Sequence, residues 1–421
     1  MNLLFETESK TVPITKEMVL AAYRKVKSNQ GSAGVDKESL ESFQANLSGN
    51  LYKIWNRLSS GSYFPQPVKE VEIPKSNGGK RKLGIPTVSD RIAQEVIKSY
   101  LEPRLEAIFH NHSYGYRPLK SAHQAIRQVQ ENVRNYSWVI DMDIKSYFDE
   151  VDHVLLMKAL DKHVEEGWVK MYILRWLESP VQSKDGQLRS KEGKGTPQGG
   201  VISPLLANLY LHYVLDKWLE LKYPHISFVR YADDVVVHCH SEVEAQEILQ
   251  AIQNRLQECT LRLNETKTQI VYCKDYRRKE KKGYRNKFDF LGFSFKPTMY
   301  RSSRKKGSVF LGYGCEMRRK ARSIIVNDWR KRNWHRQSNL SIQDIAIGIN
   351  AQMRGLINYF GTINSKGMHK LIRSLHFRLA KWSMNKYKRL RGKFGQAYNW
   401  LREIKASYPN MFYHWTIYNW I

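Results

Sequence analysis

The stretch Tyr231–Asp234, with the sequence Tyr-Ala-Asp-Asp, places two carboxylates side by side near the middle of the chain. β-prone residues lie on both sides of it, Phe228–Arg230 before and Val235–Val237 after. This pattern predicts a tight hairpin with the acids at its turn. Two neighbouring anions repel each other, and a divalent cation that binds carboxylate oxygens removes the repulsion. The residues alone leave two interpretations open, a solvated turn and part of a metal site.

A second acidic segment, Trp138–Ile144, alternates as a strand does. Its even-numbered residues are apolar and share one predicted face, whereas Asp141 and Asp143 lie on the other. Carboxylates beside a core are costly unless a cation or hydrogen bonds compensate for the lost water. One acid from this strand and two from the hairpin would supply the three carboxylates of a two-metal phosphoryl-transfer site. Such a site holds an attacking hydroxyl and stabilises a leaving pyrophosphate.

Two further elements could position a nucleotide. Val71–Lys75 and Lys80–Pro86 predict strands joined at an Asn-Gly turn, flanked by four cations. This is either a basic solvated hairpin or a flap whose cations bind a polyphosphate. Gly195–Val201 predicts a loop, and Ser203 is expected as the N-cap of a buried helix that follows it. The amide of Gln198 in this loop could contact a base or sugar.

Helical patterns cover much of the remaining chain, and the pattern beyond Arg301 is mostly helical. Phe288–Phe295 predicts one strand, in which Gly292 allows close approach of another backbone. The clearest predicted helical segments are residues 15–58, interrupted by a loop at Asn29–Asp36, and Glu242–Cys259, Ile349–Phe360 and Met368–Leu390.

Length and composition indicate a folded protein of two or three domains, with 421 residues, a mass of 49.5 kDa and 42% apolar residues. The sequence contains neither an apolar run of membrane-spanning length nor a recognisable leader, so we expect a cytoplasmic protein without membrane contact. Four cysteines without a C-x-x-C pair indicate buried free thiols rather than disulfides or a zinc knuckle.

The net charge of +29 is unevenly distributed. From Arg301 onward there are 25 lysines and arginines against four acidic residues, a net of +21, which leaves +8 for the first 300 residues. Basic residues interleaved with aromatic ones favour a nucleic-acid surface over a merely solvated tail. The tryptophans of this segment are Trp329, Trp334, Trp382, Trp400, Trp415 and Trp420.

The order of these motifs resembles that of the group II intron-encoded reverse transcriptases/maturases, over nearly the whole chain. Each motif is weak by itself, and their common order makes coincidence remote. The matching stretches are Asn29–Asp36, Ile73–Thr87, Ser113–Pro118, Asp143–Asp149, Pro197–Asn208, Tyr231–Asp234, Leu263–Thr268, Phe290–Phe293 and Ile349–Phe360.

The resemblance implies an α+β fold, a right-hand polymerase with fingers, a palm built on an antiparallel sheet, and a helical thumb that is also the maturase X domain. It divides the chain into residues 1–66, an RNA-binding N-terminal extension and first fingers block; 67–300, the reverse transcriptase fingers and palm; 301–388, the thumb; and 389–421, a basic tail and DNA-binding remnant.

By the same resemblance, Asp143, Asp233 and Asp234 are the catalytic acids, and together with Ile144 they hold two Mg²⁺ ions. Asp141 lies outside this set, and we expect it to be structural. The residues implied to contact the incoming dNTP are Lys75 and Arg81 at the triphosphate, Gln198 at the sugar, Phe148 blocking a 2′-hydroxyl and Lys267 donating a proton to pyrophosphate. Those implied for template and primer are Arg117, Pro197, Gly199, Tyr231, Leu291 and Gly292.

The implied function is RNA-directed DNA polymerisation combined with binding of structured intron RNA, which assists splicing and target-primed insertion into DNA. The expected partners are the intron RNA or RNA template and a DNA primer or target, with the protein associated with the nucleoid. Two alternatives remain open, a domesticated reverse transcriptase and a splicing-only RNA-binding protein. The cysteine pairs of an HNH endonuclease domain are missing from this sequence, so second-strand cleavage is not expected of it.

Overall fold

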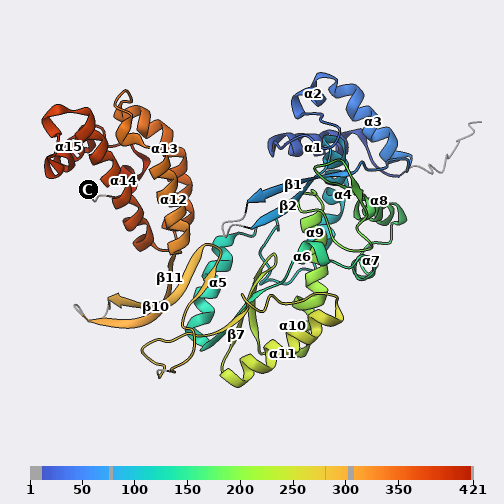
Figure 1. Cartoon of the computed structure of the whole chain (residues 1–421). Coiled ribbons are helices and arrows are strands. Elements are labelled where there is room, and N and C mark those ends of the chain that lie inside the picture. The colour runs from blue at the N-terminus through green and yellow to red at the C-terminus, as the bar shows by residue number, and fades with distance from the viewer. Residues whose placement is uncertain (1–11, 75–78, 280, 302–307, 419–421) are drawn as a thin grey trace, which may run out of the picture. The chain divides into compact units, whose positions relative to one another are not determined.

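The computed structural model describes residues 12–418 except 75–78, 280 and 302–307, and it combines helices with three main sheets (Figure 1). Contacts along the chain divide it into two compact units. The first unit comprises the residues up to Ser121, Met142–Val237 and Gln246–Gln269. The second comprises Ala122–Asp141, His238–Ala245 and the chain from Ile270 onward.

Three short helices open the first unit and confirm the predicted helical start: α1 (Lys16–Ser28), α2 (Leu40–Ala45) and α3 (Leu47–Ser59). The predicted break at Asn29–Asp36 is a loop held by a side chain of α4 (Val88–Glu106). The Arg91 guanidinium on α4 donates to the carbonyls of Gln30 at 3.4 Å and Ser32 at 2.9 Å. This loop is therefore an anchored connection between helices.

The predicted basic hairpin is confirmed as β1 (Val68–Pro74) and β2 (Lys80–Ile85), which pair antiparallel with Ile73 opposite Arg81. Its turn, including Lys75, lies outside the described residues. Two short strands, β4 (Val181–Gln182) and β5 (Leu188–Arg189), extend this sheet in the order β2-β1-β4-β5. Three further helices of the first unit are α6 (Tyr147–Glu150), α7 (His153–Asp161) and α8 (Gly167–Glu178).

The predicted buried helix is α9 (Ser203–Leu211), in which every residue except Pro204 is buried. The expectation that Ser203 caps this helix is wrong, because Ser203 is its first residue and Ile202 occupies the N-cap position. The Gln94 side chain instead accepts a hydrogen bond from the Val201 amide at 2.8 Å, which satisfies a donor just before the helix. The helix continues as a π-helical turn, η1 (His212–Asp216), and then as α10 (Lys217–Lys222).

The sheet that carries the acids has the strand order β6-β7-β3-β8. Its strands are β6 (Ser227–Tyr231), β7 (Asp234–Cys239), β3 (Trp138–Asp143) and β8 (Gln269–Tyr272). The predicted strand over Trp138–Ile144 and the predicted hairpin with acids at its turn are both confirmed. The helix expected at Glu242–Cys259 is α11 (Glu242–Glu258).

The single strand predicted over Phe288–Phe295 is wrong, because the chain reverses within it. The strands β9 (Phe288–Phe290) and β10 (Phe293–Arg301) pair antiparallel, and β11 (Val309–Met317) completes a sheet in the order β11-β10-β9. Leu291 and Gly292 at the reversal both have positive φ, +46° and +80°. Two successive positive φ values are typical of a tight hairpin turn, and glycine adopts one of them without strain.

Helices make up most of the second unit, as predicted for the chain beyond Arg301. Its core contains five of the tryptophans that were predicted to line a nucleic-acid surface, which corrects that part of the prediction, and Trp420 lies outside the described residues. Large indole rings bury more apolar area than any other side chain, so a small bundle uses them as its core. The helices are α5 (Ala122–Asn135), α12 (Arg319–Lys331), α13 (Ile342–Leu356) with its π-helical continuation η3 (Ile357–Gly361), α14 (Ser365–Lys386), α15 (Phe394–Ser407) and α16 (Tyr413–Ile417).

Two further sequence expectations concern the whole chain. All four cysteines are buried free thiols, as predicted. Among the residues that the structure describes, no helix is both long and apolar enough to cross a membrane.

Candidate active site

The acids predicted to act together lie at adjoining strand ends within the first unit. Asp143 is the last residue of β3, Asp233 lies in the turn between β6 and β7, and Asp234 is the first residue of β7. β7 and β3 are neighbours in the sheet. The carboxylates of Asp143 and Asp233 are close enough to interact electrostatically. The fold therefore brings together groups that are 90 residues apart in the sequence.

Lys267 is the direct partner of Asp143. Its ammonium group lies 2.8 Å and 3.1 Å from the two carboxylate oxygens. The segment that carries Lys267 runs beside the end of β3, because the Asn264 amide donates to the Asp143 carbonyl at 2.7 Å. Within the described ranges, no three acidic, histidine or cysteine side chains are already grouped as a metal-ligand set. Lys267 is thus the cation that the fold places beside Asp143.

The surroundings of the Asp233 carboxyl group disfavour its ionised form. Burial raises its pKa from the usual value, and the nearby Asp143 carboxylate raises it further, whereas a backbone hydrogen bond and the cations Lys267 and Arg230 lower it. A divalent cation would relieve both causes, since it replaces lost hydration and neutralises paired carboxylates. The oxygen donors of Asp143, Asp233 and Asp234 therefore fit a hard cation. Ile144 could offer such an ion only its backbone carbonyl, because its side chain is a hydrocarbon without a donor atom.

The backbone of the acidic turn is held in an uncommon conformation. Ala232 has φ +57°, in the left-handed region that residues with a Cβ rarely adopt. The segment before Arg117 lies directly against this turn, because a Cβ built on Gly115 would be 2.3 Å from the Ala232 nitrogen. The Tyr114 amide also donates to the Arg230 carbonyl at 2.8 Å. A glycine is thus required at position 115 for the two backbones to meet.

The loop that carries Gln198 is held between two other motifs. The Gln198 carbonyl accepts from the Gly84 amide of β2 at 2.9 Å, and the Thr196 amide donates to the Phe148 carbonyl at 2.7 Å. Gly199 has φ +128°, and a Cβ there would lie 2.3 Å from the Gly84 carbonyl oxygen. A cavity of about 350 Å³ beside this loop is lined in part by Pro197 and Gln198. The predicted sugar contact, Gln198, therefore borders open space.

Arg81 and the acids share an electrostatic neighbour in Tyr116. Burial raises the pKa of the Tyr116 hydroxyl, the Asp233 carboxylate raises it further, and Arg81 lowers it. Arg81 itself is exposed on β2, and Phe148 and Tyr231 are half-buried. The predicted triphosphate contact of Arg81 stays a prediction, as does that of Lys75, which lies outside the described residues.

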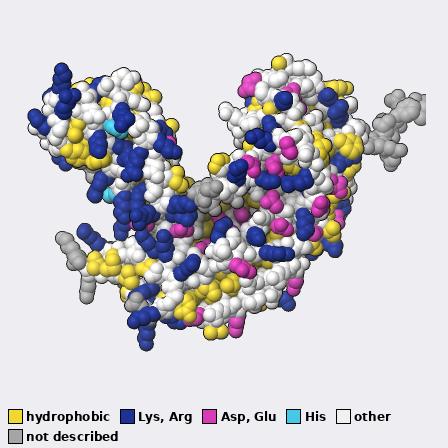
Figure 2. Space-filling model, viewed as in Figure 1, with side chains coloured by type: hydrophobic (Ala, Val, Ile, Leu, Met, Phe, Trp, Pro, Cys, Tyr) yellow, Lys and Arg dark blue, Asp and Glu magenta, His cyan; other side chains and the backbone are white. Residues whose placement is uncertain are grey.

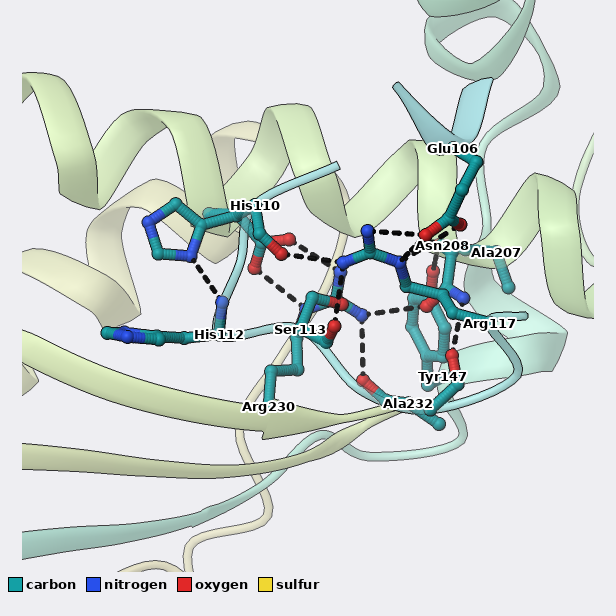
Figure 3. A network of polar contacts seen from close by, with 12 residues as sticks. Glu106, His110, His112, Ser113, Arg117, Tyr147, Ala207, Asn208, Arg230 and Ala232 are labelled. Carbon is teal, nitrogen blue, oxygen red and sulfur yellow. Dashed lines mark hydrogen bonds and ion pairs between the residues drawn. The ribbon is translucent and has the colours of Figure 1, made fainter. Parts of the chain in front are cut away.

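Arg117, predicted to contact the template or primer, has its guanidinium turned inward. It forms an ion pair with Glu106 at 2.6 Å and donates to the carbonyls of His110 and Ser113 at 2.6 Å and 2.7 Å. Its side chain is only 4% exposed, and Figure 3 shows its guanidinium group beside Glu106. These contacts organise the segment beside the acidic turn, and the template contact stays a prediction without support from this geometry.

The two remaining predicted contacts, Leu291 and Gly292, lie in the second unit. The Tyr359 hydroxyl donates to the Leu291 carbonyl at 2.9 Å, and the Arg318 amide donates to the Gly292 carbonyl at 3.0 Å. Within this unit, the β9–β10 turn is thus held by the residue that follows β11 and by the η3 turn. Their contact with a primer stays a prediction.

Sequence reasoning missed three side chains behind the acidic turn: Asn208, Asp216 and Arg230. A signal for them was available. Arg230 is a cation inside the apolar run that leads into the turn, and Asp216 is an acid inside an apolar helical run. Charged residues at positions expected to be buried require partners.

Paired acids at adjoining ends of a sheet, with a lysine beside them, are the arrangement expected of a metal-dependent phosphoryl-transfer site. The comparisons with known proteins name the family. Residues 73–295 match the model described as "Reverse transcriptase (RNA-dependent DNA polymerase)", and residues 329–399 match "Group II intron, maturase-specific domain". The chain belongs to the reverse transcriptase family, and it carries a group II intron maturase domain. The predicted family is confirmed, and the helices and sheets of the structure agree with the predicted α+β class.

The relatives agree with this family. The chain is 35% identical to "Protein YkfC" of Escherichia coli (strain K12) over 302 residues, which cover 62% of this chain and 78% of that protein. It is 36% identical to "Group II intron-encoded protein LtrA" of Lactococcus lactis subsp. cremoris over 214 residues, 49% of this chain and 34% of that one. The chain thus matches about a third of LtrA. Among solved structures, a Candida albicans telomerase in complex with telomeric RNA aligns over 85% of this chain and 66% of that chain, with a TM-score of 0.47 and 12% identity.

Proposed function

We propose that this protein is an RNA-directed DNA polymerase that also binds structured intron RNA, assisting splicing and target-primed insertion of the intron into DNA. The observation that carries the proposal is the site of the first unit, where Asp143 and Asp233 lie within electrostatic range and Lys267 pairs with Asp143. The reaction joins a primer 3′-hydroxyl to the α-phosphate of a dNTP and releases pyrophosphate. Base pairing with an RNA template selects the nucleotide.

The proposed roles of the side chains follow from their places. Asp143, Asp233 and Asp234 would hold two Mg²⁺ ions, which when bound activate the 3′-hydroxyl and neutralise charge on the leaving pyrophosphate. Lys267 would be displaced from Asp143 when the acids hold these ions, and its ammonium group would then be available as a proton donor to pyrophosphate. The nucleotide contacts proposed on the remaining side chains are Lys75 and Arg81 at the triphosphate, Gln198 at the sugar and Phe148 against a 2′-hydroxyl.

Binding of intron RNA is proposed for the second unit. Lys370, Arg373 and Lys381 are exposed along α14 at intervals of three and eight residues, so they lie on similar sides of the helix. Figure 2 shows lysine and arginine side chains gathered over the region of α12 and α14. Such a surface favours contacts with phosphates and with RNA shape rather than with base sequence. We place residues 301–388 in this role, together with 1–66 and the tail at 389–421, and expect the protein near the nucleoid.

The polymerase proposal is tested by Asp233→Asn in a primer-extension assay on an RNA template with Mg²⁺ and dNTPs. The variant keeps the size of the side chain and removes its charge, so incorporation should fall by about a thousandfold or more. Binding of the RNA template, measured in parallel, should change little. The matched control is Asp161→Asn on α7, where the carboxylate pairs with Lys170 outside the site. Incorporation by Asp233→Asn at the rate of this control would overturn the site.

A further inference from the structure

The first unit contains a fully buried ion pair between Arg230 on β6 and Asp216 on the π-turn η1. The guanidinium Nε and Nη2 lie 2.7 Å and 2.5 Å from the two carboxylate oxygens, and neither side chain is exposed. Burying two charges costs more than a well-packed apolar pair of similar volume, so such a pair is weak evidence for stability. We therefore look for another group that this ion pair holds in position.

The remaining donor group of Arg230 identifies the group that is positioned. Nη1 donates to the Asn208 side-chain oxygen at 2.9 Å and to the Ala232 carbonyl at 3.0 Å. Ala232 directly precedes Asp233. Figure 3 shows dashed lines from one end of the Arg230 guanidinium group to both Asn208 and Ala232. One planar side chain thus connects a buried carboxylate, the buried helix α9 and the backbone of the acidic turn.

The turn requires such support. Ala232 holds a left-handed φ of +57°, a conformation that persists in residues with a Cβ only where the surroundings impose it. Asn208 also donates from its amide nitrogen to the Gly115 carbonyl at 2.7 Å. The same asparagine therefore fixes both Arg230 and the segment that lies against Ala232.

The π-turn explains how Asp216 reaches Arg230. An additional residue in a helical turn rotates all the following positions by about 100° around the helix axis. Asp216 is the last residue of this turn, and it is completely buried facing β6. Single π-turns are frequent at functional sites, and this one supplies a buried anion behind the acidic turn.

We propose that Arg230, oriented by Asp216 and Asn208, is a positioning residue that holds the Ala232–Asp233 backbone so that Asp233 can bind a divalent cation. The inference rests on the proposed function and deepens it. Arg230 does not contact a reacting atom in this account, because its guanidinium is buried behind the turn. A lysine could pair with Asp216, but a single ammonium group cannot reproduce the planar fork that reaches three partners.

The test is Arg230→Lys, read by two independent measurements. Binding of Mn²⁺ to the protein without nucleic acid, followed by electron paramagnetic resonance, should weaken about tenfold or more, as for other residues that orient metal ligands. In primer extension, kcat should fall about 10- to 100-fold while the KM for dNTP stays within about twofold. The Mg²⁺ concentration that gives half-maximal activity should rise by about the same factor as the Mn²⁺ affinity falls.

The matched control is Arg278→Lys in the second unit. Arg278 is also a largely buried arginine that bonds backbone carbonyls, those of Cys273, Val133 and Arg134, beside the carboxylate of Asp275. The same substitution there should leave Mn²⁺ affinity and kcat within about twofold. A general cost of replacing a buried arginine would instead affect both variants equally, and that result would overturn the proposal.

A second variant guards against misfolding of Arg230→Lys. Replacing both charges, as Arg230→Met with Asp216→Leu, removes the buried pair without leaving one charge alone, so thermal unfolding should remain cooperative. This folded double variant should also bind Mn²⁺ about tenfold or more weakly. Wild-type Mn²⁺ affinity in either variant overturns the proposal. The two proposals can also fail separately. If the wild-type protein incorporates no dNTP, the polymerase function is refuted. If it still binds Mn²⁺ through Asp233, and Arg230→Lys weakens that binding, the positioning role of Arg230 stands.

Discussion

Arginine and lysine serve two opposite purposes in this protein, and each unit gives a clear example. In the first unit, Arg230 and Arg117 are buried, and each has a carboxylate and backbone carbonyls as partners. In the second unit, cations such as Lys370 and Arg373 are exposed along a helix, in the part of the chain with a net charge of +21. A buried cation therefore fixes the position of a backbone segment, whereas exposed cations attract a polyanion such as RNA.

Among the tests of this comparison, Gly115→Ala, which disturbs the positioned backbone, should have the largest effect. The added methyl group would lie 2.3 Å from the Ala232 nitrogen, so the acidic turn has to move. A shift of about 1 Å at a catalytic group costs about a hundredfold in rate, which primer extension would detect. RNA binding should be unchanged. Gly167→Ala is the control, because a Cβ there has open space, and equal activity of the two variants would refute the close approach of the two backbones.

The opposite use of charge is tested by Lys370→Glu combined with Arg373→Glu on α14. RNA affinity near 0.1 M salt should fall about tenfold or more, and the slope of log affinity against log salt should decrease by about one for each phosphate that the helix no longer neutralises. The kcat at saturating primer and template should remain near that of the wild type. The swapped pair Lys370→Arg with Arg373→Lys keeps both charges and should behave as the wild type. Unchanged salt dependence in the reversed variant would remove α14 from the RNA surface.

Acid should weaken the second unit through two buried histidines. His376 and His414 lie with their Nε2 atoms 2.8 Å apart. Burial lowers the pKa of His376 to about 4, and burial together with His376 and Lys405 places the pKa of His414 well below its usual value. An unfolded histidine titrates near pH 6.5, so the unfolded chain binds protons first. Stability from this pair is complete above that pH and is lost as the pH falls toward 4.

Between pH 7 and pH 5 this loss should amount to about 2 kcal/mol for each histidine that resists protonation. Hydrogen exchange of the amides in α14 and α16 would report it, since these helices carry the pair. The variant His376→Gln with His414→Gln should show a flatter dependence on pH. If the hydrogen-exchange protection of these amides stays constant from pH 7 to pH 5 in the wild-type protein, the prediction is contradicted.

The smallest effect concerns the stability of the first unit without metal. The pKa of Asp233 is raised by burial and by Asp143, so its contribution to stability is present at low pH and is lost as the pH rises through the folded-state pKa. At pH 7.5 the ionised carboxylate is a cost, and Asp233→Asn should raise Tm by a few degrees in EDTA. The difference should vanish near pH 4, as differential scanning calorimetry can show. A lower Tm for the variant at pH 7.5 would contradict this account.

Local patterns in the sequence were sufficient for the elements that carry the acids. Alternation over Trp138–Ile144 and the apolar runs around Tyr231–Asp234 gave the strand and the hairpin, because each side chain there reports its own face of a sheet. The reversal at Leu291–Gly292 was not predicted, because a glycine within an apolar run fits a close backbone approach as well as a turn. The tryptophans of the second unit were misassigned because a basic helix and its buried face share the same stretch of sequence.

The contacts behind the site could not be read from the sequence. Lys267 pairs with Asp143 across 124 positions, and local periodicity carries no information on such a pairing. Asp216 and Arg230 are 14 positions apart, but they meet only because a π-turn changes the helical register. A period of 3.6 residues would have assigned Asp216 to another face.

A crystal structure of the protein with a primer, an RNA template, a non-hydrolysable dNTP and Mn²⁺ tests the central claim most directly. The account predicts anomalous peaks between the carboxylates of Asp143 and Asp233, at about 2.0–2.3 Å from their oxygens, and Lys267 moved away from Asp143. An ion pair between Lys267 and Asp143 that persists in the ternary complex, without metal between the acids, would contradict it.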